Sequence, residues 1–221
     1  MKKINTIFFG THEFAVTILK GLIESPFISV DAVVTQPDKQ VGRNKKLKAS
    51  PVKVFAESQK IKLLQPESLK NFELVGEFDI GIVAQYGKLI PNKILESPKN
   101  GILNVHTSLL PKYRGASPIQ SAIINGETET GVTIMKMDKG LDTGDIILQE
   151  KAPIGKDDTY PELDKKLADV AFKILPDAIS KYVDGDLVPK KQNNSETTEC
   201  RQFSREDGLV DWNKTSDKIY N

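Results

Sequence analysis

Continuous apolar runs, without polar alternation, constrain the fold of this chain more than any other feature. A strand with one face in water alternates apolar and polar residues, so a continuous run is typical of a strand covered on both faces. These runs lie at 4–9, 30–34, 79–84 and 101–105. Stretches with helical spacing of apolar residues separate them, at 14–23, 51–59 and 91–95. Strands that alternate with helices predict an α/β fold, with an open, mostly parallel, twisted sheet and helices on both of its faces.

The second half of the chain predicts a hairpin and a long helix. Two β-rich runs, 130–137 and 146–154, are joined by a loop dense in glycine and aspartate, and 160–182 has an amphipathic helical pattern. We expect a first domain over 1–189, then a linker and the start of a further region over 190–221. A new helix begins near Thr215 only a few residues before the sequence ends, so we expect the chain to be a fragment of a longer protein.

Cysteine and histidine are scarce in this chain. Cys200 is the only cysteine, which excludes an internal disulfide and a thiolate metal cluster and fits a reducing, cytoplasmic setting. His12 and His106 are the only histidines, so no set of metal ligands is apparent and we expect no metal. The N-terminal apolar run is interrupted too early for a secretory signal, and no later run is long enough to span a membrane.

The formal net charge of +1 is unevenly distributed. The stretch from Lys39 to Lys53 contains six cations and no acidic residue, and we interpret it as a loop. Such a stretch is usually only a solvated surface, but concentrated positive charge can also bind phosphate groups. The candidates for such contacts are Arg43, Lys45, Lys46 and Lys48.

Asn104 and His106 are the first candidates for chemistry. They lie two residues apart at the end of a predicted strand, so their side chains project to the same side. The ligand crevice of an open parallel sheet lies beyond the carboxyl ends of its strands, where this pair falls. From position alone, a structural histidine and a turn-forming asparagine explain the pair more readily. Asp142 alone is also explained more readily as a turn residue, because a tight turn between two strands favours aspartate.

A longer motif favours a catalytic role for these residues over a structural one. Ser108–Ile119 (SLLPKYRGASPI), with Asn104–His106 (NVH) and Leu141–Asp145 (LDTGD), resembles the signature of the folate-dependent formyltransferases. Phe9–Ala15 and Glu129–Thr133 resemble the same family, and the similarity extends along nearly the whole chain. The resemblance implies a Rossmann-like formyltransferase fold. It is strongest for the branch of the family that formylates methionine on initiator tRNA for translation initiation.

The resemblance implies that Asn104, His106 and Asp142 are catalytic, and the chemistry of formyl transfer agrees. The reaction passes through a tetrahedral adduct, which needs a proton acceptor for the attacking amine and a hydrogen-bond donor for the developing oxyanion. Histidine is the side chain that exchanges protons most readily near neutral pH, which suits His106 to carry the proton. Asn104 can donate to the oxyanion, and Asp142 would stabilise the protonated ring of His106.

The resemblance also implies a folate pocket and 10-formyltetrahydrofolate as cosubstrate, with no metal. The implied pocket residues are Ser108, Leu109, Leu110 and Pro111, together with Gln85, Tyr86 and Gly87. Two residues depart from the family pattern. Gln85 stands where relatives usually carry a small residue, and His12 stands where they usually carry proline. Neither departure touches the three implied catalytic residues.

The implied partner is initiator methionyl-tRNA, because in the resembled enzymes the stretch corresponding to Arg43, Lys45, Lys46 and Lys48 enters the acceptor stem. We expect a monomer without a membrane partner. One alternative is an enzyme of the same fold whose amine lies on an amino sugar nucleotide or a small ribonucleotide. Another is a folate- or RNA-binding relative without turnover, which the presence of all three catalytic residue types disfavours.

Overall fold

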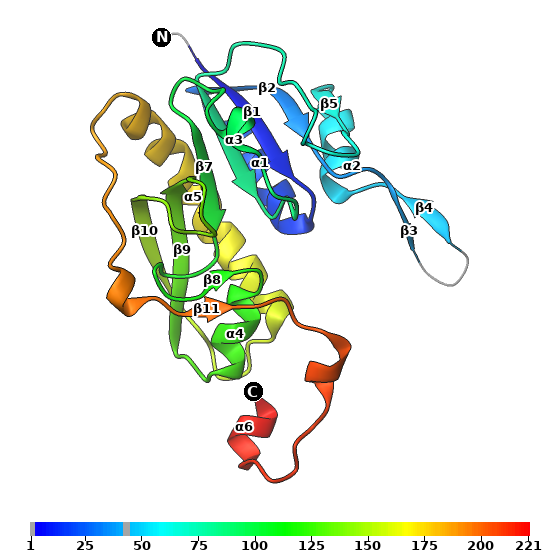
Figure 1. Cartoon of the computed structure of the whole chain (residues 1–221), viewed down its shortest axis with the longest axis vertical. Coiled ribbons are helices and arrows are strands. Elements are labelled where there is room, and N and C mark those ends of the chain that lie inside the picture. Colours follow the sequence, from blue (N-terminus) through cyan, green and yellow to red (C-terminus); the bar gives the residue numbers. More distant parts are fainter. Residues whose placement is uncertain (1–2, 42–44) are drawn as a thin grey trace.

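A computed structural model of the chain describes residues 3–41 and 45–221, and its centre is a seven-stranded sheet. The strand order is β10-β9-β7-β6-β1-β2-β5 (Figure 1). In chain order these strands are β1 (Ile4–Gly10), β2 (Ile28–Val34), β5 (Lys62–Leu64), β6 (Ile80–Ala84), β7 (Ile102–His106), β9 (Glu129–Lys136) and β10 (Ile146–Pro153). Each run that predicts a strand overlaps one of them. β5 was missed because its sequence, KLL, is too short to form a run.

The sheet is mostly parallel, as predicted. Five of its strands, from β5 to β7, run parallel. β9 pairs antiparallel with β7, and β10 pairs antiparallel with β9. The connection between Lys136 and Ile146 is too short for the crossover that a parallel pair needs, so the edge of the sheet is an antiparallel hairpin.

Helices cover both faces of the sheet, which confirms the prediction. The α-helices of the described residues are α1 (Glu13–Glu24), α2 (Pro51–Ser58), α3 (Asn92–Leu95), α4 (Pro118–Ile124), α5 (Tyr160–Val183) and α6 (Ser216–Tyr220), of which α6 lies away from the sheet (Figure 1). α1, α2 and α5 pack with one core cluster, and α3 packs with the other. α2 begins where the sequence predicts, because the Ser50 side chain accepts from the Lys53 amide and Pro51 fits the first turn. None of the helices in the described ranges combines the length and hydropathy of a membrane span.

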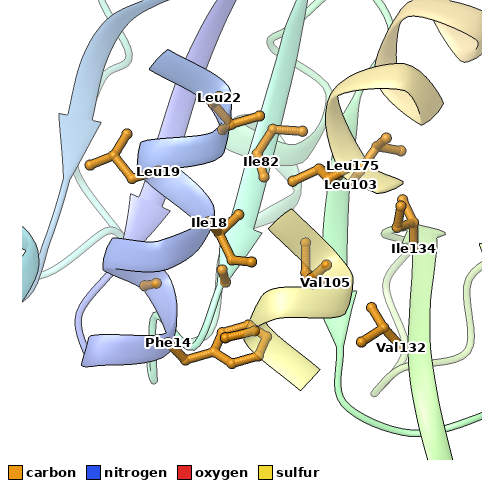
Figure 2. Packing of buried hydrophobic residues seen from close by; sticks show 14 of the residues in the cluster. Phe14, Ile18, Leu19, Leu22, Ile82, Leu103, Val105, Val132, Ile134 and Leu175 are labelled. Atoms are coloured by element: carbon orange, nitrogen blue, oxygen red, sulfur yellow. The ribbon is translucent and has the colours of Figure 1, made fainter. Parts of the chain in front are cut away.

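The two core clusters lie on opposite faces of the sheet. Along β1, Phe8 belongs to one cluster, whereas its neighbours Ile7 and Phe9 belong to the other. Figure 2 shows how side chains from α1, β6, β7, β9 and α5 meet in the first cluster. Because both faces of the central strands are buried, no position along them has to be polar, which explains the continuous apolar runs.

The basic stretch forms a hairpin and not the loop that was expected. β3 (Lys39–Val41) and β4 (Lys46–Lys48) pair antiparallel with each other, and the pair projects from the body of the molecule (Figure 1). Among its described residues none belongs to either core cluster, so the hairpin has no apolar pattern that would predict strands. Arg43 lies outside the described residues.

Residues 190–200, expected to be part of a linker, pack on the sheet domain. Lys190 forms a backbone bridge with Ile146, and β11 (Glu199–Cys200) pairs parallel with β8 (Arg114–Gly115). These contacts favour a boundary later than the expected one after residue 189. We propose a boundary after Cys200 in its place.

Candidate active site

The three predicted catalytic residues converge at the carboxyl end of β7. Asn104 and His106 project from this strand, and Asp142 reaches them from the loop between β9 and β10. The Asn104 amide donates to Asp142 Oδ1 at 3.3 Å, and His106 Nδ1 lies 3.7 Å from Asp142 Oδ2. The side chains of His106 and Asp142 are 6% and 11% exposed, so water screens their interaction only weakly. The fold thus brings together the groups that the sequence separates.

Asp142 has an unusual backbone conformation. Its φ of 52° lies in the left-handed region, which aspartate and asparagine tolerate better than most residues. Its Oδ2 also accepts a hydrogen bond from the Gly115 amide at 2.9 Å. Only glycine fits at 115, because φ there is 123° and a Cβ would lie 2.1 Å from the Cys200 carbonyl oxygen. Both carboxylate oxygens are held by donors, which fixes the direction of the Asp142 side chain.

His106 is held in one tautomer by the Tyr113 carbonyl. Its Nε2 lies 2.9 Å from that oxygen, which can only accept, so Nε2 carries a hydrogen. In the neutral ring the lone pair is then on Nδ1, the nitrogen nearest Asp142. Tyr113 itself has a φ of 59°, so this carbonyl also depends on a left-handed residue. The arrangement provides a base at Nδ1 and a carboxylate that stabilises the positive charge of the protonated ring.

All three side chains line a cleft of about 980 Å³. This volume lies at the upper end of the range for small-molecule sites. Residues 140–142 belong to its lining, which also includes the apolar residues Val83, Ile90, Leu95 and Met137. Apolar side chains of this kind suit a flat heteroaromatic ring.

Three of the predicted folate residues line this cleft, on the loop that follows β6: Gln85, Tyr86 and Gly87. Gln85 and Gly87 have φ values of 42° and 75°, and the Tyr86 carbonyl accepts hydrogen bonds from Thr11 and Gln36. Burial raises the pKa of Tyr86 to about 12, so its hydroxyl stays protonated. That hydroxyl has no hydrogen-bond partner among the described residues.

The other predicted folate residues are not part of the cleft lining: Ser108, Leu109, Leu110 and Pro111. This run lies against β9 and β10. The Thr133 hydroxyl donates to the Ser108 carbonyl and accepts from the Leu110 amide, and Gln149 donates to the Leu110 carbonyl. These polar groups are therefore bound within the domain and are not available to a ligand. For this reason we do not include the run among the proposed folate contacts.

A polar cluster beside the cleft was missed in the sequence interpretation. The Gln85 amide donates to Asp164 Oδ1 at 2.9 Å, which links the β6 loop to α5. Burial raises the pKa of Asp164, although the Gln85 bond and nearby His12 oppose this. Burial also lowers the pKa of His12, and Lys39 lowers it further. An aspartate on an amphipathic helix looks solvent-facing in sequence, so no local pattern could have revealed this contact.

The predicted phosphate-binding lysines lie on the projecting hairpin. Lys45, Lys46 and Lys48 are exposed. Lys53, in contrast, pairs with Asp38 at 2.8 Å, so its charge is locally balanced. The positive surface is therefore smaller than the sequence suggested, and it is concentrated at the hairpin.

Comparison with known proteins agrees with this geometry. The formyl transferase family matches residues 2–179. The methionyl-tRNA formyltransferase of Caldanaerobacter subterraneus is 48% identical over 97% of this chain and 71% of its own length, and that of Dictyoglomus turgidum is 46% identical over 97% and 69%. A solved sugar 3N-formyl transferase, determined in the presence of dTDP and 5-N-formyl-THF, has a TM-score of 0.74 at 27% identity, covering 100% of this chain and 78% of that one. A family match over most of the chain, with identity at this level, shows that the chain belongs to the formyl transferase family.

Proposed function

We propose that the chain transfers the formyl group of 10-formyltetrahydrofolate to the α-amino group of methionyl-initiator tRNA, which prepares this tRNA for translation initiation. One observation carries the proposal. Asn104, His106 and Asp142 meet in one cleft, in a chain that is 48% identical to a methionyl-tRNA formyltransferase.

His106 is the proposed proton carrier. Formyl transfer forms a bond between the amino nitrogen and the formyl carbon, and it breaks the bond from that carbon to N10 of the folate. One proton must leave the amine, and one must reach N10. Because Nε2 is bound to the Tyr113 carbonyl, Nδ1 is free to take the first proton and to supply the second. The ring is therefore neutral again at the end of the cycle.

Asn104 is the proposed donor to the oxyanion. Its amide has two N–H groups and uses one on Asp142. The other remains for the oxygen that becomes negative in the tetrahedral adduct, an interaction worth roughly 3 kcal/mol at comparable acyl-transfer sites. Asp142 then acts on both partners: it holds the Asn104 amide in place, and its charge stabilises the protonated ring 3.7 Å away.

A folate-type cosubstrate is supported by the family and by the sugar 3N-formyl transferase determined with 5-N-formyl-THF. We assign the contacts with its ring to the apolar lining of the cleft and to Gln85, Tyr86 and Gly87.

The proposed contacts with the tRNA backbone are Lys45, Lys46 and Lys48, together with Arg43 from the sequence alone. Lys39, at the base of the hairpin, lies close enough to His12 to lower the pKa of that ring, and His12 lines the cleft. The positive hairpin therefore adjoins the site that the amine must reach. Contacts of this kind position an RNA without reading its sequence.

An amino sugar nucleotide is the second candidate acceptor. The sugar 3N-formyl transferase superimposes on the whole of this chain, so the fold alone fits either substrate. Sequence identity favours the tRNA, at 48% against 27%. The hairpin also favours it, because clustered lysines suit an extended polyanion better than a single nucleotide.

The decisive experiment offers the protein three acceptors in parallel. With 10-formyltetrahydrofolate present, we expect tetrahydrofolate release and formyl-methionine with methionyl-initiator tRNA, and no turnover with a dTDP-amino sugar or glycinamide ribonucleotide. His106→Asn is the matched control, and we expect its rate to fall by about 10²–10⁴-fold. Turnover with the sugar nucleotide and none with the tRNA would select the alternative.

A further inference from the structure

Residues 190–200 lie beyond the part of the chain that the formyl transferase family matches, yet they contact the site. Ile146 and Lys190 exchange two backbone hydrogen bonds of 2.8 Å at the start of β10. Farther along, β11 pairs with β8 beside Gly115. Figure 1 shows the segment in orange, passing β10 and then reaching β11. The segment is attached near both ends, and Gln192 lies between the attachments.

The Gln192 side chain uses all of its hydrogen-bonding capacity on the site loops. Its amide nitrogen donates to the carbonyl oxygens of Asp142, at 2.9 Å, and Gly144, at 2.7 Å. Its amide oxygen accepts from Arg114 Nε and Nη2, at 3.0 and 2.6 Å. One side chain therefore joins the loop that carries Asp142 to β8, the strand that contains Gly115.

Arg114 depends on the same segment. It is 7% exposed, and its side-chain partners among the described residues are the amide oxygens of Gln192 and Asn194. A buried guanidinium has to be satisfied by hydrogen bonds, because water cannot reach it. Arg114 in turn holds the Gln192 oxygen, which directs the Gln192 nitrogen at the two carbonyl groups.

The far end of the segment supports His106. The Thr198 hydroxyl accepts from the Tyr113 amide at 2.8 Å, and the Thr198 carbonyl accepts from the Arg114 amide at 2.9 Å. Tyr113 supplies the carbonyl that fixes the His106 tautomer. Residues 190–200 thus contact the supports of both Asp142 and His106.

We propose that Gln192 is a positioning residue for formyl transfer, which holds Asp142 in the left-handed conformation that its carboxylate needs to reach Asn104 and His106. A left-handed conformation is strained for a non-glycine residue, and it persists where neighbouring groups determine it. Gln192 supplies the donor to the carbonyl of that residue. This inference rests on the proposed function for its kinetic part and on the geometry alone for its structural part.

Gln192→Glu is the sharpest variant. Glutamate keeps the length of the side chain and pairs well with Arg114, but it has no hydrogen to donate to the carbonyls of Asp142 and Gly144. Glu199→Gln is the matched control, since Glu199 is exposed on the same segment and keeps its backbone pairing with Arg114. Each protein is measured in two ways: steady-state formyl transfer to methionyl-initiator tRNA, and amide hydrogen exchange of residues 138–145.

For Gln192→Glu we expect kcat to fall by about 10–100-fold, since a displacement near 1 Å has such an effect, while KM for either substrate changes less than about threefold. Exchange in residues 138–145 should become at least about tenfold faster, with the rest of the sheet unchanged. Glu199→Gln should match the wild type in both measurements. A folded Gln192→Glu protein with wild-type kcat and wild-type exchange would overturn the proposal, as would a rise in KM at unchanged kcat.

Gln192→Met covers the case in which the glutamate variant does not fold, because it keeps the volume without any charge. If neither variant folds, the residue acts on stability and the proposal is wrong. Failure of the wild type to formylate methionyl-tRNA would remove the proposed function. The exchange comparison would still decide whether Gln192 holds the loop of Asp142.

Discussion

At the scale of single residues, the geometry of the site depends on the two acceptor oxygens of the Asp142 carboxylate. Its two carboxylate oxygens accept from Asn104 and Gly115. Asparagine would fit the left-handed backbone at φ 52°, but it offers one acceptor oxygen and one donor nitrogen. Whichever way that amide is turned, its nitrogen meets an N–H group of Asn104 or Gly115. Loss of the charge and a mismatched hydrogen bond therefore occur together.

We expect Asp142→Asn to lower kcat by about 10²–10³-fold, the range seen when a charge-stabilising group is removed from an acyl-transfer site. The mismatched donors should lower the free energy of unfolding by about 1–2 kcal/mol. Steady-state formyl transfer and chemical denaturation measure the two effects. Wild-type values for both would contradict the role proposed for Asp142.

A double exchange separates the hydrogen bonds from the chemistry. When Asn104→Asp is added to Asp142→Asn, the amide at 142 can donate to the carboxylate at 104 and accept from Gly115. Stability should then return to within about 0.5 kcal/mol of the wild type. The value of kcat should stay low, because no amide at 104 remains to donate to the oxyanion. Recovery of kcat would show that only the pairing matters.

At the scale of elements, one hydrogen bond links the cleft to α5. Gln85, with a φ of 42°, leads the loop after β6 and donates to Asp164 on the helix. This contact gives the departure from the family pattern at Gln85 a structural role, since the longer side chain reaches α5. Asp164→Asn tests the link, because the amide oxygen can still accept from Gln85 while the half-buried charge is removed.

The stability of Asp164→Asn should depend on pH. Burial raises the pKa of Asp164, so the folded state holds its proton more tightly than the unfolded chain does. The penalty for the charged form is therefore complete above the raised pKa and absent below the ordinary value of 3.8. We expect the variant to be more stable by roughly 0.5–1 kcal/mol at neutral pH, with near-normal activity. In thermal unfolding, an advantage that grows as the pH falls would contradict this account.

The elements that could be predicted from sequence are those with a pattern of their own. The buried strands carry continuous apolar runs, and Ser50–Pro51 marks the start of α2. β8 and β11 have two residues each, and they pair across about 85 positions of the chain. Such strands exist because the fold brings two backbones together, so no local periodicity can reveal them. The hairpin of β3 and β4 differs, because its strands are neighbours in sequence and it was expected to be a loop for lack of an apolar pattern.

At the scale of the whole molecule, the candidate site divides into a part that the sequence marks and a part that only the fold creates. Asn104, His106 and Asp142 lie in motifs, and their convergence follows from the position of β7 in the sheet. Gln192 acts through a contact between segments 50 positions apart, which no motif records. Ser108–Pro111 shows the opposite case. This run belongs to the motif, but its polar groups are used inside the domain.

Charge is also a property of the whole molecule. The chain carries a formal charge of +1, so a general attraction for RNA cannot come from its total charge. It has to come from the local concentration of Lys45, Lys46 and Lys48 on the projecting hairpin. Each lysine that neutralises a phosphate releases a counterion, and that release makes the affinity for nucleic acid depend on salt.

Replacement of Lys45, Lys46 and Lys48 by alanine should therefore weaken binding of methionyl-initiator tRNA and reduce its dependence on salt. If each lysine contacts one phosphate, the slope of log Kd against log salt should fall in magnitude by about 2–3, and Kd at about 0.1 M salt should rise by roughly 10–100-fold. The KM for 10-formyltetrahydrofolate should not change, because these lysines are not among the residues that line the cleft. Titrations at several salt concentrations measure the slope directly.

The matched control removes the same total charge from other faces of the molecule, at Lys20, Lys93 and Lys151. Each of these lysines is exposed and pairs with a glutamate: Glu24, Glu73 and Glu129, respectively. If the hairpin binds the phosphates, the control slope should stay within about 0.5 of the wild-type slope. Equal losses in the two triple variants would mean that tRNA responds to total charge, and the hairpin would then have no special part in binding.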